Sequence, residues 1–285
     1  MLYSTLKFTK IMMKKNKITF WGVRGSFPTP DHDKMNYGGH TSCVSIETEK
    51  ETLIMDMGTG IKNLGESIVS NPNSPSEINI ILSHYHWDHI IGFPIFAPLF
   101  SDKYKINIYG KKDDVKLKEI IKHMLNPIFW PVSFDDFKAE LNFYTIDNNE
   151  IKISNSMNIK SQIHHHPHGA LSYKITSQNK MISYITDCEY LSGEPNEKLI
   201  QFVNNSDLLI HDAHFTVEDL PNHKGWGHSS WKQAVTMAQK SKSKQLALYH
   251  YSPNYNDTQI ESIESDSKKA FKQTIAAKQG LVIYL

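Results

Sequence analysis

His84-Tyr85-His86-Trp87-Asp88-His89 is the stretch that decides the fold, and it follows a mostly apolar run at residues 78–82. Such a run is typical of a buried β-strand, so the polar stretch lies where a strand leaves its sheet. Alternation along an extended chain places the first two histidines on the same side. The aspartate and the last histidine follow where the chain turns into a helix, so four donors can converge from one loop. We interpret the stretch as a site for two metal ions rather than a histidine-rich surface loop.

The overall composition indicates a globular chain without a strong charge. Among its 285 residues, 31 Lys and Arg balance 30 Asp and Glu to a net charge of +1, so no basic excess favours nucleic acid. No run approaches the roughly 18 apolar residues of a membrane span, and Lys7 and Lys10 interrupt the N-terminal apolar segment. Cys43 and Cys188 fit reduced, buried thiols. We predict a cytoplasmic protein without membrane contact or a stable nucleic-acid complex.

The order of elements along the chain predicts one layered domain. Residues 1–16 are expected to be an N-terminal extension, and no linker or repeat divides residues 17–285. Apolar, β-branched runs alternate with helical patterns, which suggests an αββα sandwich of the α/β (α+β) class. The predicted strands are 18–22, 43–46, 52–55, 78–82, 105–109, 159–164, 171–175, 181–185, 208–210, 246–249 and 281–285, and the predicted helices are 61–70, 115–124, 197–203, 231–241 and 258–278.

The pattern His-x-His-x-Asp-His at residues 84–89 resembles the signature of the metallo-β-lactamase superfamily. The resemblance implies a four-layer αββα metallo-β-lactamase sandwich with a dinuclear metal site. His166 and Tyr173, with six residues between them, are similar to the third ligand motif of the phosphodiesterase branch and its tRNA-processing relatives. The neighbouring His165 and His168 are the alternatives to His166 as the ligand.

Two further strand ends carry residues that resemble the remaining ligands of this family. Asp187 ends an apolar run and is similar to the bridging aspartate, although it also fits a turn cap. His250 ends another and is similar to the last histidine, although it also fits a core position. The resemblance implies one ion held by three histidines, a second held by one aspartate and two histidines, and Asp187 between them. These sets are His84, His86 and His166 for the first ion, and Asp88, His89 and His250 for the second.

The donor types leave the identity of the two divalent ions open. Imidazole and carboxylate favour zinc, while manganese or iron also suits them. Asp56 follows the run at 52–55, and the resemblance implies that it orients groups of the metal site without binding metal. A helix N-cap is its alternative role.

A two-metal site predicts hydrolysis. A metal-bridging hydroxide can attack a phosphoryl group at neutral pH, while the ions neutralise the phosphoryl oxygens. The leaving alkoxide then needs a proton, and His228 resembles the catalytic histidine of the tRNA-processing endonucleases. In those enzymes the partner of this histidine is more usually a glutamate, and here Asp212 stands in its place. The alternative role of His228 is a helix cap. The predicted catalytic residues are Asp88, His228 and Asp212.

Several other stretches favour one branch of the superfamily. Residues 21–26, 37–42, 92–94 and 226–229 resemble a subgroup of bacterial phosphodiesterases and cyclic-nucleotide phosphodiesterases related to ribonuclease Z. The resemblance implies a metal-dependent phosphodiesterase that cleaves a small or cyclic nucleotide, with a homodimer as a possible assembly. A tRNA 3′-processing endonuclease is the alternative, but its long arm has no room between His166 and Asp187, which are 21 positions apart. A lactonase or β-lactamase, and a metal-stabilised binding protein, are further alternatives.

Two features remain open between a structural role and substrate binding. Arg24, Thr41 and Ser42 are candidates for phosphate contact, and each is equally compatible with an internal role. The aromatic stretches at 126–132 and 93–100 are expected to join the hydrophobic core, and stacking on a base is their alternative.

Overall fold

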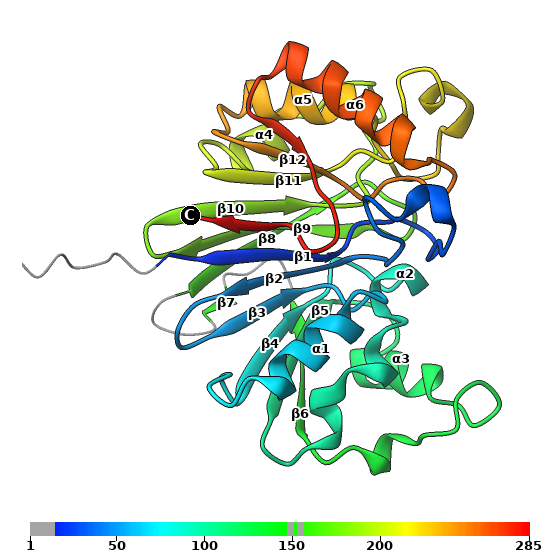
Figure 1. The fold of residues 1–285 in the computed structure, drawn as a ribbon, viewed down its shortest axis with the longest axis vertical. Helices are drawn as coiled ribbons and strands as arrows, with labels where there is room; N and C mark the ends of the chain where they lie inside the picture. Colours follow the sequence, from blue (N-terminus) through cyan, green and yellow to red (C-terminus); the bar gives the residue numbers. More distant parts are fainter. Residues whose placement is uncertain (1–14, 147–150, 153–156) are drawn as a thin grey trace, which may run out of the picture.

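The computed structural model describes residues 15–146, 151–152 and 157–285. Within them, two sheets of seven strands each pack face to face, and helices cover the outer side of each sheet (Figure 1). The predicted αββα sandwich is therefore confirmed. Residues 1–14 of the predicted N-terminal extension lie outside the described residues, and the division into 1–16 and a single domain at 17–285 stays a prediction.

The first sheet combines an antiparallel and a parallel half. β1, β2 and β3 pair antiparallel, whereas β3, β4, β5 and β6 pair parallel. Parallel pairing brings the carboxyl ends of β3 and β4 to one edge, where Asp56 and the 83–89 stretch follow. The strands, in their order across the sheet, are β14 (Val282–Tyr284), β1 (Lys17–Gly22), β2 (Cys43–Glu47), β3 (Thr52–Met55), β4 (Glu77–Ile81), β5 (Lys105–Lys111) and β6 (Glu140–Ile146).

The second sheet repeats this plan. β10, β11, β12 and β13 are parallel, so their carboxyl ends also meet at one edge. Asp187 follows β10, Asp212 ends β11 and His250 follows β12. The strands, in their order across the sheet, are β13 (Thr274–Ala276), β12 (Leu246–Tyr249), β11 (Leu208–Asp212), β10 (Lys180–Ile185), β9 (Ala170–Ser177), β8 (Met157–His164) and β7 (Ile151–Lys152).

The helices divide between the two outer faces (Figure 1). α1 (Ile61–Ser70) and α3 (Leu117–Met124) lie on the first sheet, and α4 (Glu197–Phe202), α5 (Trp231–Lys240) and α6 (Asp257–Ala270) lie on the second. A one-turn helix, α2 (Trp87–Ile90), follows the strand-end stretch after β4. Short 3-10 turns complete the helical elements: η1 (His32–Lys34), η2 (Phe93–Ile95), η3 (Ala97–Phe100), η4 (Phe134–Asp136) and η5 (Leu220–His223).

Three buried tyrosines of the second sheet bond across the core to the first. The hydroxyl of Tyr173 donates to the carbonyl of Leu82 at 2.6 Å, and that of Tyr249 donates to the carbonyl of Gly22 at 2.8 Å. Tyr184 donates to the Asp56 carboxylate at 2.8 Å. Because buried hydroxyls need partners, these bonds help to fix the offset between the two sheets. They thereby also fix the offset between the two edges where the carboxyl ends of the parallel strands meet.

The structure differs from the sequence prediction in the last third and in the middle of the chain. The helix predicted at 258–278 ends at Ala270, because residues 274–276 add a parallel strand beside β12. β6 was not predicted, since its residues are mostly half-exposed at the sheet edge and lack a clear apolar face. The stretch at 126–132 was expected in the core, but none of its residues is buried: Ile128 and Phe129 are 84% and 75% exposed, and Trp130 is half-buried against the core. Phe93 and Phe96 of the stretch at 93–100 are fully buried, as expected. The final predicted strand is confirmed as β14.

Arg24 has a structural role. Its guanidinium is fully buried and donates to the carbonyls of Gly38 at 2.9 Å, Tyr255 at 2.7 Å and Lys34 at 3.2 Å. Thr41 is similarly engaged, because its hydroxyl accepts a bond from the amide of Thr59 at 2.8 Å. Arg24 is therefore engaged inside the fold rather than presented to a phosphate.

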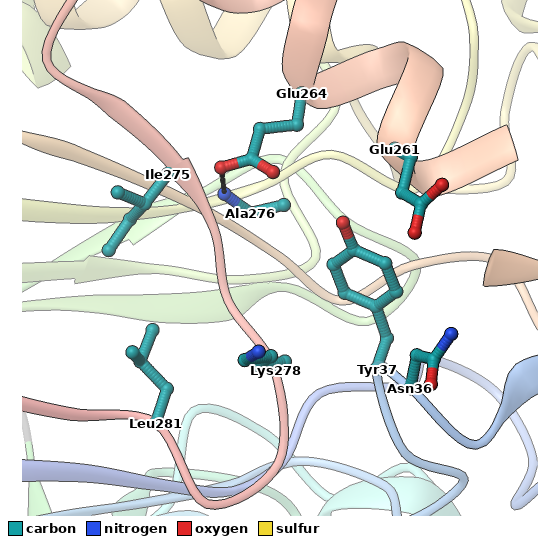
Figure 2. A pocket seen from close by; sticks show the side chains of 8 residues that line it. All are labelled: Asn36, Tyr37, Glu261, Glu264, Ile275, Ala276, Lys278 and Leu281. Carbon is teal, nitrogen blue, oxygen red and sulfur yellow. Dashed lines mark hydrogen bonds between the residues drawn. The ribbon is translucent and has the colours of Figure 1, made fainter. Parts of the chain in front are cut away.

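A hollow of about 360 Å³ lies between α6, β13 and the segment that contains Tyr37 (Figure 2). Glu264 accepts a bond there from the amide of Ala276 at 3.1 Å, and the polar lining also includes Asn36, Glu261 and Lys278. None of the predicted ligands lines this hollow.

Among the described residues, no helix is both long and apolar enough to cross a membrane.

Candidate metal centre

The candidate site forms where the carboxyl ends of both sheets face each other. Asp56, Asp187 and His250, each directly after or close behind a strand, have positive φ angles of 62°, 53° and 62°. A residue other than glycine rarely adopts this left-handed conformation, and it costs about 1–2 kcal/mol. Such strain gathers at functional sites, where the surrounding structure maintains it.

Three histidines form the first group. The ligand atoms of His84, His86 and His166 lie within 4.8 Å of one another, and His166 Nε2 is 3.1 Å from His86 Nδ1. His84 Nε2 is buried and has no hydrogen-bond partner in the described part of the chain. Burial lowers the pKa of His84 and of His166, so both rings are neutral, as metal ligation requires. An unpartnered buried nitrogen beside two other imidazoles fits a metal ion.

Asp88, His89, Asp187 and His250 form the second group, again with ligand atoms within 4.8 Å. Asp187 Oδ2 lies 3.1 Å from His89 Nε2 and 3.2 Å from His250 Nε2. Burial opposes charge on Asp187, but His250, His89 and His84 hold the pKa of its carboxyl well below the usual range. An ionised carboxylate beside imidazole nitrogens is a donor set suited to a divalent ion.

Asp187 also connects the two groups. Its other oxygen, Oδ1, lies 3.8 Å from the Nε2 atoms of both His84 and His166. One carboxylate thus presents one oxygen to each group. The structure brings all seven predicted metal ligands together in these two neighbouring groups, and their binding of metal stays a prediction.

Outer contacts orient the rings of these groups. His89 Nδ1 donates to the Asp56 carboxylate at 2.8 Å, and His166 Nδ1 donates to the carbonyl of Gly227 at 2.9 Å. In both rings the Nε2 atom is therefore directed into the site. Asp56 is fully buried and also accepts a bond from the amide of Ser83 at 2.7 Å. This placement agrees with the orienting role predicted for Asp56.

His228 and Asp212 form the predicted pair beside the second group. His228 Nδ1 lies 3.0 Å from Asp212 Oδ2, which also accepts a bond from the amide of Asp187 at 2.9 Å. Burial opposes protonation of His228, but the Asp212 carboxylate beside it raises the pKa of the ring. Asp212 Oδ1 accepts bonds from the amides of His214 and Ser229. The aspartate therefore fixes both the histidine and the backbone behind Asp187.

His214 is a buried member of the site that the sequence interpretation missed. Its ring stacks on that of His228 with centroids 4.0 Å apart and an angle of 11°, and its Nδ1 donates to the carbonyl of His250 at 2.9 Å. His214, His228 and His250 also lie close enough to hold an ion. His250 already belongs to the second group, which favours a hydrogen-bonded network of His214 and His228 over a third ion. The position of His214, two residues after Asp212, is the sequence feature that could have indicated its place in the site.

The other histidines near His166 have different environments. His164 is buried, and its Nε2 contacts the carbonyls of Thr186 and Asp187 at 3.0 Å, so it supports the turn that carries Asp187. His165 and His168 are exposed, and neither belongs to a group that could hold a metal among the described residues. The geometry thus favours His166 over its two alternatives.

Two backbone features of the site were also missed. The amide of Ser26 donates to Asp88 Oδ2 at 2.7 Å. Gly25 lies so close to His250 that a Cβ atom would be 2.5 Å from the ring. Both residues belong to the stretch at 21–26, which we noted only for its resemblance to other hydrolases.

A cleft of about 640 Å³ opens onto these groups. Its volume is that of a typical small-molecule site. Residues of the two candidate metal groups lie at the bottom of the cleft, and two tryptophans line its walls. The lining residues are Ser26, Tyr85, His86, Trp87, Asp88, His166, Asp187, Gly225, Trp226 and His228.

Residues 59–251 match the family described as the beta-lactamase superfamily domain. The chain belongs to the beta-lactamase superfamily. The matched region contains all seven predicted metal ligands together with His228 and Asp212. The predicted family and fold class are confirmed, as is the prediction of a metal-dependent hydrolase.

Individual members of the superfamily are similar over nearly the whole chain. A ribonuclease Z of Thermoplasma acidophilum is 25% identical, with 94% of this chain and 95% of that protein covered. The crystal structure of the metallo-β-lactamase fold protein YhfI from Bacillus subtilis has a TM-score of 0.74 at 20% identity, covering 95% of this chain and 100% of that one. The short form of human tRNase Z has a TM-score of 0.68 at 19% identity, covering 94% and 98%. The two structures establish the shared fold.

Proposed function

We propose that the chain is a phosphodiesterase with two divalent metal ions, zinc being the best fit to its donors. His84, His86 and His166 would hold one ion, and Asp88, His89 and His250 would hold the other, with Asp187 placed between the two groups. The observation that carries the proposal is the Asp187 carboxylate, which presents one oxygen to each group of ligands. When bound, the two ions activate water and neutralise charge on the phosphoryl oxygens.

The protein side chains supply the remaining acid-base chemistry. His228 lines the cleft, and its Nδ1 is occupied by Asp212, so Nε2 is the nitrogen that faces a leaving group. We propose that this nitrogen gives its proton to the leaving oxygen. Asp88 contributes a carboxylate at the cleft wall, where the amide of Ser26 holds its Oδ2 atom.

The connection between His166 and Asp187 supports a small substrate, with small or cyclic nucleotides as the proposed class. β9 and β10 pair up to Ser177 and Lys180, and Gln178 and Asn179 form the turn with φ angles of 50° and 62°. Two residues of positive φ are typical of a tight hairpin. No arm is inserted in this segment, which the structure describes completely. A long RNA would therefore lack the extra grip that the resemblance implies for tRNA-processing enzymes.

A tRNA 3′-processing nuclease is the second candidate function. It is favoured by the similarity to ribonuclease Z over 94% of the chain. The paired His228 and Asp212 serve this reaction equally well, because it also expels a ribose alkoxide. The two candidates differ in substrate size and not in chemistry.

A direct comparison of substrates tests the proposal. Enzyme loaded with Zn²⁺ or Mn²⁺ is assayed on 2′,3′-cyclic and 3′,5′-cyclic mononucleotides, on thymidine 5′-p-nitrophenyl phosphate, and on a precursor tRNA with a 3′ trailer. We expect the highest kcat/KM on a small phosphodiester. A higher kcat/KM for cleavage at the tRNA 3′ end would establish the second candidate instead. Absence of cleavage of every substrate in both metal-loaded forms would contradict both candidates.

His166 and its neighbour provide a matched pair of variants. His166→Ala is expected to weaken metal binding by at least about 100-fold, since loss of an outer contact alone costs 10–100-fold. His165→Ala should bind metal as the wild type does, because this side chain is exposed. Metal content after desalting and chelator competition measure both effects. Loss of metal from His165→Ala with retention in His166→Ala would assign the third ligand to His165.

A further inference from the structure

Two exposed tryptophans lie at the cleft without a role in the proposed chemistry. Trp87 is 70% exposed and Trp226 is 60% exposed, and both line the cleft that contains Asp187 and His228. Large aromatic side chains left in water beside a polar site are typical of ligand-binding surfaces. Among the described residues that line the cleft, none is Lys or Arg, so a substrate gains little there from cationic side chains.

The loop around Trp226 is held rigidly. The Glu189 carboxylate accepts bonds from the amides of Gly225 at 2.7 Å and Gly227 at 2.9 Å, one on each side of the tryptophan. The indole also packs edge-on against His223, with ring centroids 4.7 Å apart and an angle of 87°. An exposed aromatic ring that is fixed before binding loses little conformational entropy when a ligand stacks on it.

The same loop is tied to the metal centre. The carbonyl of Gly227 accepts the bond from His166 Nδ1, and a Cβ atom on Gly227 would lie 2.0 Å from that nitrogen. Gly227 has a φ of +87°, which favours glycine. The position of the Trp226 backbone is therefore set relative to a proposed metal ligand. The backbone of Trp87 likewise lies between two proposed ligands, His86 and Asp88, at the start of α2.

We propose that Trp226 and Trp87 bind the nucleobase of a phosphodiester substrate by stacking. This inference rests on the proposed function, because it assumes that the phosphoryl group lies at the metal centre. A nucleotide joins a charged phosphodiester to a flat aromatic base. The cleft offers a matching pair of surfaces, because its floor is polar and two exposed indoles lie beside it. Stacking on an aromatic side chain accepts every base, so the substrate class is base-bearing phosphodiesters rather than phosphodiesters of aliphatic alcohols.

Two esters with the same leaving group test the proposal. Thymidine 5′-p-nitrophenyl phosphate and the 5-p-nitrophenyl phosphate of 1,2-dideoxyribose, its abasic analogue, differ only in whether the sugar carries a base. We expect the ratio of their kcat/KM values to fall about tenfold in Trp226→Ala. Trp226→Phe should keep most of the ratio, since it keeps an aromatic face. Trp87→Leu, checked for unchanged metal content, should lower the ratio in the same direction.

Phe129→Ala is the matched control, because Phe129 is 75% exposed but does not line the cleft. Its ratio should equal that of the wild type. An unchanged ratio in Trp226→Ala would overturn the inference while leaving the proposed function intact.

If the wild type cleaves neither ester, the proposed function is contradicted. Calorimetric binding then tests the stacking site separately. Thymidine 5′-monophosphate should then still bind about tenfold more tightly than 1,2-dideoxyribose 5-phosphate, which lacks the base, and Trp226→Ala should abolish the difference. Equal binding of the two ligands by the wild type would overturn the stacking site.

Discussion

Asp187→Asn is expected to lose metal from both groups and to lower kcat/KM on small phosphodiesters by on the order of 10³-fold. The amide has nearly the same shape, but it lacks the negative charge and offers one oxygen in place of two. Asp187 Oδ2 contacts His89 and His250, and Oδ1 faces His84 and His166, so one substitution affects both groups. Metal content per chain and steady-state kinetics on the same preparation measure the effect.

Asp207→Asn is the control for this variant. Asp207 is also a largely buried carboxylate at the second sheet, where it accepts a bond from the amide of Met181 at 2.9 Å and contacts Lys244 at 2.7 Å. It should retain about two ions per chain and the activity of the wild type. If Asp187→Asn retained both ions and full activity, Asp187 would have only its turn-capping role.

The proposed ligands could be recognised in the sequence because each follows a recognisable strand. A strand that is buried on both faces has a strong sequence signal, and the polar residue that ends it stands out. Asp187 after β10 and His250 after β12 are of this kind. Parallel pairing then brings such ends to one edge, although the sequence alone does not reveal which strands pair. The resemblance to a known family supplied that missing step.

The residues that were missed act through the backbone or through packing. Ser26 contributes an amide, and Gly25 contributes the absence of a side chain, so neither residue type indicates a role in the site. His214 contributes a ring face to His228, which depends on how the loop after β11 folds. The prediction that the last helix continues beyond Ala270 was wrong because residues 274–276 pair with β12. This long-range pairing overrides the local helical periodicity.

His228→Ala is expected to retain both metal ions and to lower kcat by 10²- to 10⁴-fold, about the range of a general acid, on substrates that release a ribose alkoxide. The loss should be far smaller on p-nitrophenyl esters, because p-nitrophenolate is a stable leaving group that needs no proton. The reason lies in the geometry, since Asp212 occupies His228 Nδ1 and leaves Nε2 at the cleft. Paired assays on a cyclic mononucleotide and on thymidine 5′-p-nitrophenyl phosphate, with metal content, measure the difference.

His168→Ala is the matched control, because it removes an exposed histidine that does not line the cleft. It should leave both reactions unchanged. Equal losses on both substrates in His228→Ala, with both ions retained, would exclude leaving-group protonation and point to a role in positioning. Loss of an ion would instead make His228 a ligand together with His214 and His250, the third group that the geometry allows. The dependence on the leaving group thus decides between an acid and a positioning residue, and the metal content decides whether His228 is a ligand.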